Sequence, residues 1–168
     1  MADTDCFERL ASLVDQLPAM EKASARLRRA EAAQAALVAQ RELAEAEGLL
    51  AAADRQIAEV EQAQARAARE GDLDFDIELA TRTLLFWGQQ RGLHVGPANN
   101  ARAHLAQALR AGGFSDASEA EAALIPENEH DELAERIAHY QRDYAEALAA
   151  CKEVEGDSGT ATDAGLEL

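Results

Sequence analysis

The sequence predicts an all-α protein: an elongated antiparallel helical hairpin (coiled coil) with a small helical tip. Three observations predict this fold class. Residues 19–70 contain no proline and one glycine, and are rich in Ala, Glu, Gln, Arg and Leu, which favour helices. Two separate stretches carry the heptad spacing of paired helices. Leu, Ile, Val and Phe make up only about a fifth of the 168 residues, which favours thin helix pairs over a thick core.

The first long helix is expected over residues 7–70, as the outbound leg of the hairpin. Pro18 predicts a kink near its start, because proline fits the first turn of a helix better than its interior. At 1.5 Å per residue, the roughly fifty residues after Pro18 would form a rod of about 75 Å. Apolar and small residues recur at alternating spacings of three and four in its second half, and the large members of this seam are Leu43, Leu50, Ile57 and Val60.

Residues 71–126 are expected to form the helical tip. Its start is crowded with Asp72, Asp74 and Asp76, and carboxylates are favourable at a helix N-terminus. The alternation also resembles a calcium loop, but the Gly and Glu that such a loop needs at its sixth and twelfth positions are missing. The aspartates therefore predict helix capping.

The most hydrophobic helix of the tip is predicted over residues 73–91. Its apolar residues predict that this helix forms the core of the tip. Glycines every fourth residue then predict a loop that ends at Gly96-Pro97, before a further helix over residues 97–111. The predicted core residues are Leu73, Ile77, Leu84 and Trp87.

Residues 127–155 are expected to form the returning long helix, and residues 156–168 a disordered tail. The seam of the returning helix contains Leu133, Ile137, Tyr140 and Tyr144. Small residues in the outbound seam would leave room for the two tyrosines, so we expect residues 43–70 to pair with residues 127–154. This pairing leaves about thirty residues of the outbound leg unmatched. They would pair with a second copy, fold back at Pro18, or belong to an arm whose other half lies elsewhere.

The charge of the chain excludes some partners. A net charge of -16 disfavours nonspecific binding to nucleic acid or to an anionic membrane. Residues 80–113 contain no Asp or Glu, however, and form a candidate partner-binding tip. This segment either neutralises its acidic neighbours or binds an acidic protein surface or, weakly, a nucleic-acid strand. Its candidate residues are Arg82, Trp87, Arg91, Arg102 and Arg110.

No catalytic, cofactor-binding or metal-binding residue is predicted. The four histidines match no zinc or di-iron spacing, and Cys6 and Cys151 are too far apart in sequence to suggest a zinc ribbon or a disulfide framework. No apolar run approaches the length of a membrane span, and the acidic start is unlike a signal peptide. We therefore expect a cytoplasmic protein with no membrane partner.

Residues 106–126, followed by Leu133-Ala-Glu-Arg-Ile-Ala-His-Tyr, resemble the returning coiled-coil arm of SbcC-type subunits, the SMC-like ATPases of bacterial DNA-end-processing nucleases. The resemblance is carried by the Gly113-Phe-Ser-Asp turn, the Ala-rich helix and the amphipathic helix after it. It implies a coiled-coil arm and a role in DNA repair. The Gly-x4-Gly-Lys-Ser/Thr loop of the ATPase and the Cys-x-x-Cys zinc hook of that family are absent from this sequence.

The resemblance thus implies a structural segment without ATPase heads or zinc hook, which connects and spaces other parts and performs no chemistry. The alternative is a free-standing acidic helical chaperone, adaptor or phage scaffold protein that binds a client helix. An enzyme is a third hypothesis, and it would require a cofactor or measurable turnover.

Overall fold

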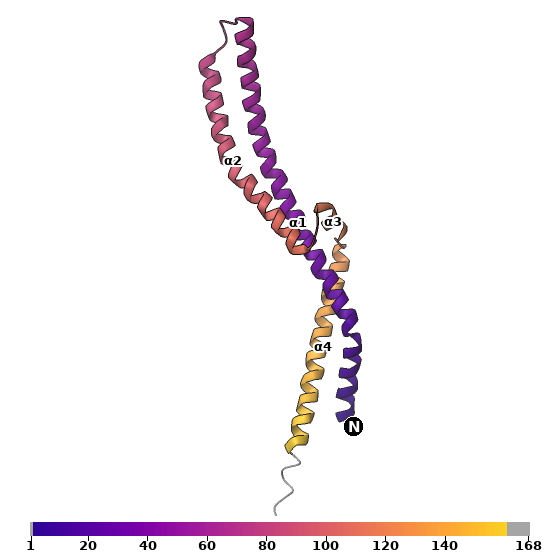
Figure 1. The fold of residues 1–168 in the computed structure, drawn as a ribbon. Coiled ribbons are helices and arrows are strands. Elements are labelled where there is room, and N and C mark those ends of the chain that lie inside the picture. Colours follow the sequence, from indigo (N-terminus) through magenta and orange to yellow (C-terminus); the bar gives the residue numbers. More distant parts are fainter. Residues whose placement is uncertain (1, 161–168) are drawn as a thin grey trace, which may run out of the picture. The chain divides into compact units, whose positions relative to one another are not determined.

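The computed structural model describes residues 2–160. This part of the chain contains helices and no strand, which confirms the all-α prediction (Figure 1). The side chains discussed below belong to residues 5–154. The helices are α1 (Ala2–Glu70), α2 (Ile77–Gly112), α3 (Ala117–Ala122) and α4 (Glu127–Thr160).

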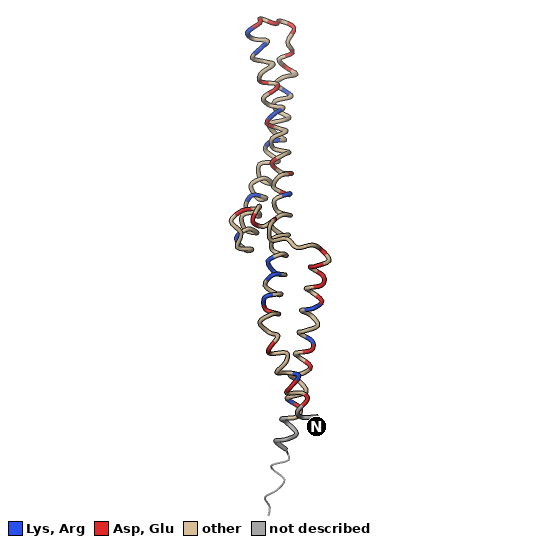
Figure 2. Tube along the Cα trace, turned by 90° about the vertical axis from the view of Figure 1, so that its right-hand side faces the viewer, with Lys and Arg blue, Asp and Glu red and all other residues tan. Residues whose placement is uncertain are grey.

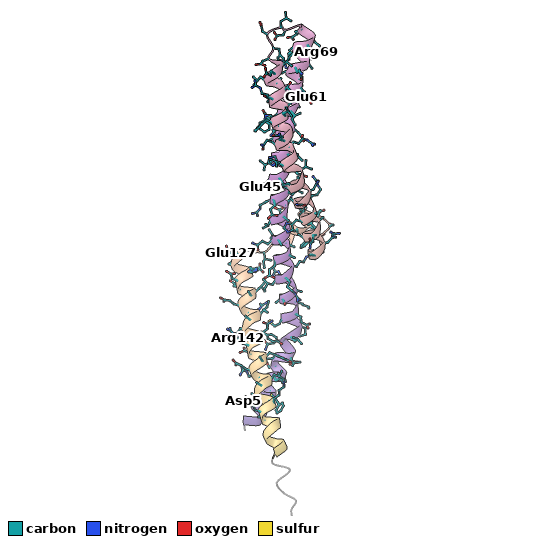
Figure 3. All side chains as sticks on the ribbon, turned by 90° about the vertical axis from the view of Figure 1, so that its left-hand side faces the viewer. Asp5, Glu45, Glu61, Arg69, Glu127 and Arg142 are labelled. Atoms are coloured by element: carbon teal, nitrogen blue, oxygen red, sulfur yellow. The ribbon has the colours of Figure 1, made fainter. Side chains whose placement is uncertain are left out.

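The helices group into two compact units. The first unit combines residues 2–31 of α1 with α4, and the second combines residues 32–70 of α1 with α2 and α3 (Figure 1). The helix α1 therefore contributes to both units. In each unit, exposed charged side chains such as those of Glu45, Glu61 and Arg142 project outward from the helices (Figure 3).

The helix α1 stays helical through Pro18, where the sequence predicted a kink. A proline inside a helix removes one backbone hydrogen bond and costs about 3 kcal/mol. Packing on both sides of Pro18 offsets this cost, because Leu13 is buried and Met20 is half-buried beside α4. The helix ends at Gly71, whose φ of 67° lets the amide of Asp72 donate to the carbonyl oxygen of Ala67 at 3.0 Å.

In the first unit, α4 runs antiparallel to the beginning of α1. Arg9 near the start of α1 pairs with Asp143 in the middle of α4, at 3.3 Å, whereas Arg26 pairs with Glu129 in the first turn of α4, at 2.6 Å. The facing sides are mostly small or apolar. Their buried residues are Leu13, Ala23 and Ala30 of α1 and Leu133, Ala147 and Cys151 of α4.

This pairing corrects two expectations. The first thirty residues of α1 have a partner within the chain, so they are not an unmatched leg. The predicted partner of residues 127–154 was also wrong, because α4 packs against residues 2–31 rather than 43–70. A heptad pattern specifies which face of a helix is covered, but two apolar seams of similar size can exchange partners.

In the second unit, α2 runs antiparallel to the second half of α1. The Nε of Arg91 donates to Oδ1 of Asp54 at 2.6 Å, and Nη2 of Arg102 donates to Oε1 of Glu47 at 2.5 Å. Further along, Nδ1 of His104 lies 3.0 Å from Oε2 of Glu42. The predicted outbound seam lies in this pair, where Leu43, Leu50, Ile57 and Val60 are half-buried.

The segment predicted as a tip over residues 71–126 is therefore mainly a full partner helix. A short connection, residues 71–76, returns the chain directly along α1, and neighbours in sequence commonly become neighbours in space. Asp76 caps α2, since its Oδ1 accepts from the amide of Leu79 at 2.8 Å.

The loop predicted over Gly88–Pro97 is also absent, because α2 continues through it. Glycine costs a helix about 1 kcal/mol and proline about 3 kcal/mol, so the local sequence disfavours helix here. Packing against α1 offsets that cost: Val95 is half-buried and Ala98 is buried on either side of Pro97.

Alanines form most of the core around the C-terminal end of α2. Ala33 and Ala36 of α1 contact Ala120 of α3 and the buried ring of Phe114, with Leu109 packed against this cluster. Gly113, with φ 67°, ends α2, and the amide of Phe114 donates to the carbonyl oxygen of Leu109 at 2.9 Å. This helix-terminal motif turns Phe114 back onto α1 and α3.

Two further expectations change. Leu73 is 99% exposed and Ile77 is 63% exposed, so neither is a core residue, whereas Leu84 and Trp87 are half-buried. The helix α4 extends to Thr160, five residues into the segment predicted as a disordered tail. Residues 161–168 of that predicted tail lie outside the described residues.

Candidate functional site

The segment without carboxylates forms most of α2 (Figure 2). Two of its four arginines, Arg91 and Arg102, face α1 and pair with Asp54 and Glu47. Each of these four side chains is about half exposed, so the pairs are surface ion pairs that each contribute at most about 1 kcal/mol. These two arginines therefore stabilise the helix pair.

The other predicted tip residues do not join them in one site. Nη2 of Arg82 lies 3.9 Å from Oε1 of Glu78, one turn earlier in α2, and Nε of Arg110 donates to the carbonyl oxygen of Ala106 at 3.1 Å. Trp87 is half-buried and meets the ring of Phe86 edge-on, with centroids 5.1 Å apart. Arg82 and Arg110 are separated by roughly 40 Å along a helix.

A different group of side chains on α2 is available to a partner. Leu79, Phe86 and Leu93 are 55%, 52% and 66% exposed, and they recur every seven residues on one face of the helix. We call these three residues the outer stripe. On another face of α2, an open hollow of about 430 Å³ is lined by Thr81, Leu84, Leu85, Gly88 and Gln89.

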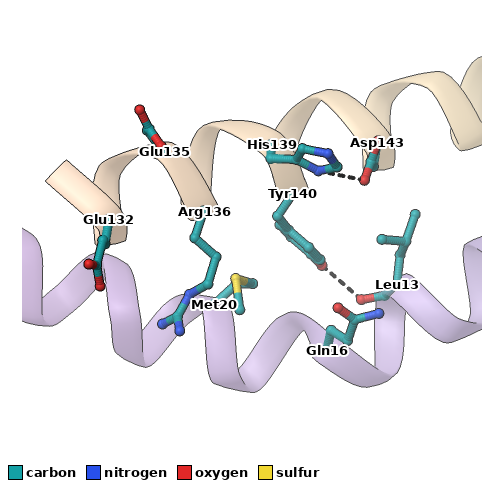
Figure 4. A pocket seen from close by; sticks show the side chains of 9 residues that line it. All are labelled: Leu13, Gln16, Met20, Glu132, Glu135, Arg136, His139, Tyr140 and Asp143. Carbon is teal, nitrogen blue, oxygen red and sulfur yellow. Dashed lines mark hydrogen bonds and ion pairs between the residues drawn. The ribbon is translucent and has the colours of Figure 1, made fainter. Parts of the chain in front are cut away.

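The first unit carries an open groove of about 490 Å³ between α1 and α4 (Figure 4). Tyr140 reaches across it, and its hydroxyl donates to the carbonyl oxygen of Leu13 at 2.9 Å. On α4, Nδ1 of His139 lies 2.8 Å from Oδ2 of Asp143. The residues that line the groove are Leu13, Gln16, Met20, Glu132, Glu135, Arg136, His139, Tyr140 and Asp143.

Burial raises the pKa of the Tyr140 hydroxyl above its ordinary value of 10.0, and the nearby Tyr144 and Glu21 raise it further. The hydroxyl therefore stays protonated and acts as a hydrogen-bond donor. It contacts the turn of α1 that precedes Pro18, where the side chain of Gln16 also donates to a backbone carbonyl, that of Ser12.

The groove is lined by charged, polar and apolar side chains. Its nine lining residues include no Ser, Thr, Cys or Lys. Among the residues that the structure describes, no group of three His, Cys, Asp or Glu side chains could hold a metal ion. Arg136 and the acidic side chains of α4 give the groove charges of both signs.

The sequence did not predict which face of the first part of α1 is covered. Leu13 is buried, and Leu10, Met20 and Leu27 are half-buried, while Phe7, Val14 and Leu17 are exposed. The spacing from Leu13 to Met20 and Leu27 is seven residues each time. This repeat, which includes Met20, is the sequence signal for a partner of the first part of α1.

In comparisons with known proteins, no family model matches this chain, and no curated protein or solved structure is significantly similar to it. None of the helices within residues 2–160 combines the length and hydrophobicity that crossing a bilayer requires. The candidate sites are therefore the two described from geometry: the outer stripe on α2 and the groove between α1 and α4.

Proposed function

We propose that this chain is a non-enzymatic coiled-coil segment that connects and spaces other parts of a larger assembly, with the arm of an SbcC-like ATPase subunit as its preferred identity. The supporting observation is the path of the chain in the first unit. Arg9 of α1 pairs with Asp143 and Glu146 near the middle of α4, whereas Arg26 pairs with Glu129 in its first turn, so the helices are antiparallel and α1 starts at the end of the pair toward which α4 runs. A segment with this path can project from another domain and return to it.

The construction of both helix pairs supports the same proposal. Each pair combines an apolar or alanine-rich seam with ion pairs between its helices, such as Arg26–Glu129 and Arg91–Asp54. These are the features of a spacer, and the proposal assigns no reaction and no cofactor to the chain. Its proposed location is the cytoplasm, where DNA-processing machines act.

Co-purification from the source cells tests this proposal. A tagged chain should be recovered with an ATPase that carries a phosphate-binding loop, and nuclease treatment of the extract should leave that association intact. The genes on either side should include a reading frame for such an ATPase. Recovery of the chain without any ATPase, together with neighbours unrelated to DNA processing, would contradict the arm function.

The second candidate function is an acidic adaptor, chaperone or phage scaffold protein that binds a client helix. The outer stripe favours it, because a helix with exposed apolar residues at heptad spacing can accept another helix. Titration of the purified chain with amphipathic helical peptides separates the two functions, since a client-binding protein should bind them with saturation and a spacer should not.

A further inference from the structure

The helix α2 has apolar residues on two faces. Its inner face, with Leu84, Trp87 and Leu105, is half-buried against α1, whereas its outer stripe of Leu79, Phe86 and Leu93 is exposed. A surface helix normally carries one apolar face, and a helix that is apolar on two faces is usually covered on both. Five of the large exposed hydrophobic side chains of this protein lie between Ile77 and Leu93. This concentration indicates a covered surface.

The positions between the outer stripe residues complete a second heptad seam. The outer stripe residues alternate along the helix with Arg82, Gln89 and Gly96, at spacings of three and four residues. All three of these intervening residues are exposed. Gly96 has open space where a side chain would be, as do Gly88 and Gly92. A neighbouring helix could therefore approach α2 closely.

The seam is complementary to itself when two copies run antiparallel. Leu79 and Leu93 lie seven residues on either side of Phe86, so a twofold axis at Phe86 places each leucine against the other leucine of the second copy. The same axis places Arg82 against Gln89 or Gln90 of the second copy. The arginine can then donate to an amide oxygen, and no two like charges meet.

Charge favours this face over any other for contact between two copies. The chain carries a net charge of -16, so two copies repel each other over most of their surface. Residues 80–113 contain no carboxylate, and two of the arginines in this segment are already paired with α1. An acidic partner would find only Arg82 beside the outer stripe, and Glu78 already lies next to it.

We propose that a second copy of this chain covers the outer stripe, so that two α2 helices pack antiparallel about Phe86. Each α1–α2 pair becomes half of a four-helix bundle, an arrangement in which the second apolar face of each α2 is buried. The proposal does not depend on the arm function, because the contact is made by α2 alone.

Sedimentation of the purified full chain over a range of concentrations tests the proposal. The chain should be a dimer that dissociates on dilution. Phe86→Glu and Leu93→Glu should each raise the dissociation constant by at least about a hundredfold, because each change acts twice in a symmetric dimer. The matched control is Leu49→Glu on α1, a leucine of equal exposure to Leu79 that lies outside the outer stripe, and it should remain a dimer.

A disulfide cross-link tests the position of the axis. In a chain with Cys6→Ala and Cys151→Ala, a single cysteine introduced as Phe86→Cys should form a covalent dimer under mild oxidation, while Leu49→Cys should not. Circular dichroism of every variant checks that the helices are retained. A chain that stays monomeric at all concentrations, or a dimer that survives both glutamate substitutions, would overturn the proposal. Neither outcome would affect the arm function, which is tested by co-purification from cells.

Discussion

At the scale of single residues, Tyr140 shows how one polar group joins two helices. The sequence placed it in the seam of the returning helix, where alanines of residues 43–70 would accommodate it. Its side chain instead lies against the first part of α1, and its hydroxyl donates to the carbonyl oxygen of Leu13 (Figure 4). Its position in a seam followed from heptad spacing, whereas its hydrogen-bond partner depended on which helix lies opposite.

Replacing Tyr140 by Phe should lower the stability of the first unit and change its pH dependence. The pKa of Tyr140 is raised in the folded protein, so the folded state holds this proton more tightly than the unfolded chain. The resulting stabilisation is complete below the ordinary pKa of 10.0 and is lost as pH rises through the raised value. Thermal melts of both proteins at neutral pH and above pH 10 check this.

The expected result of these melts is a lower midpoint for Tyr140→Phe at neutral pH and a smaller decrease at high pH than in the parent chain. Tyr144→Phe is compared at neutral pH: it removes a neighbouring hydroxyl, with ring centroids 6.1 Å apart, but keeps the hydrogen bond from Tyr140 to Leu13, so its midpoint should change less. Equal alkaline losses in the parent and in Tyr140→Phe would show that the hydrogen bond to Leu13 does not contribute.

At the scale of the elements, glycines have opposite roles that the sequence alone does not separate. Gly71 and Gly113 end α1 and α2 with φ values of 67°, a conformation that favours glycine. Gly88, Gly92 and Gly96 lie inside α2 and interrupt nothing. The sequence predicted that these three would open a loop. The free-energy cost of glycine in a helix follows from the sequence alone, whereas the packing of α2 on α1 does not.

Gly112→Ala should destabilise the second unit, because a Cβ at this position would collide with the ring of Phe114 and lies 3.2 Å from Ala32. Overpacking of this kind costs about 1–3 kcal/mol. Gly48→Ala is the control: no neighbouring atom lies within 4 Å of the place that a Cβ would take, and the change should stabilise α1 by about 0.5–1 kcal/mol. Urea unfolding of both variants measures these changes, and a neutral Gly112→Ala would contradict the observed packing of Phe114.

Reversing the charge of Arg91 should weaken the α1–α2 pair. Arg91→Glu would place a carboxylate beside Asp54 and cost about 1 kcal/mol at low salt, with a smaller effect at high salt. The double variant Arg91→Glu with Asp54→Lys should recover most of this loss. A double-mutant cycle by urea unfolding measures the coupling, and no recovery would show that the pair at 2.6 Å does not stabilise the unit.

At the scale of the whole molecule, the central finding is the division of α1 between two partners. Residues 2–31 pair with α4, and residues 32–70 pair with α2, so each half of the longest helix has its own antiparallel neighbour. The sequence predicted one hairpin with a compact tip, because α2 was expected as two short helices. Once α2 is continuous, it is long enough to cover the second half of α1.

Cross-linking by pairs of cysteines tests this division in a chain with Cys6→Ala and Cys151→Ala. Asp54→Cys with Arg91→Cys should cross-link efficiently through a short bismaleimide, as should Arg9→Cys with Asp143→Cys. Asp54→Cys with Arg102→Cys is the control, because Arg102 lies eleven residues beyond Arg91 in α2, opposite Glu47. Efficient cross-linking of Asp54→Cys to a cysteine in α4 would instead support the pairing expected from the heptads.

The sequence by itself determined the all-helical class, the seam positions within residues 43–60 and 133–144, and the absence of carboxylates from most of α2. Those properties are local: they follow from helix propensity and from periodicity along one chain. The tertiary structure decided the pairing of α4 with the start of α1, the continuity of α2 and the exposure of Leu79, Phe86 and Leu93. The reason is physical, because the free energy that selects a partner and keeps Pro97 within a helix comes from packing between helices, and residue spacing along one helix does not encode it.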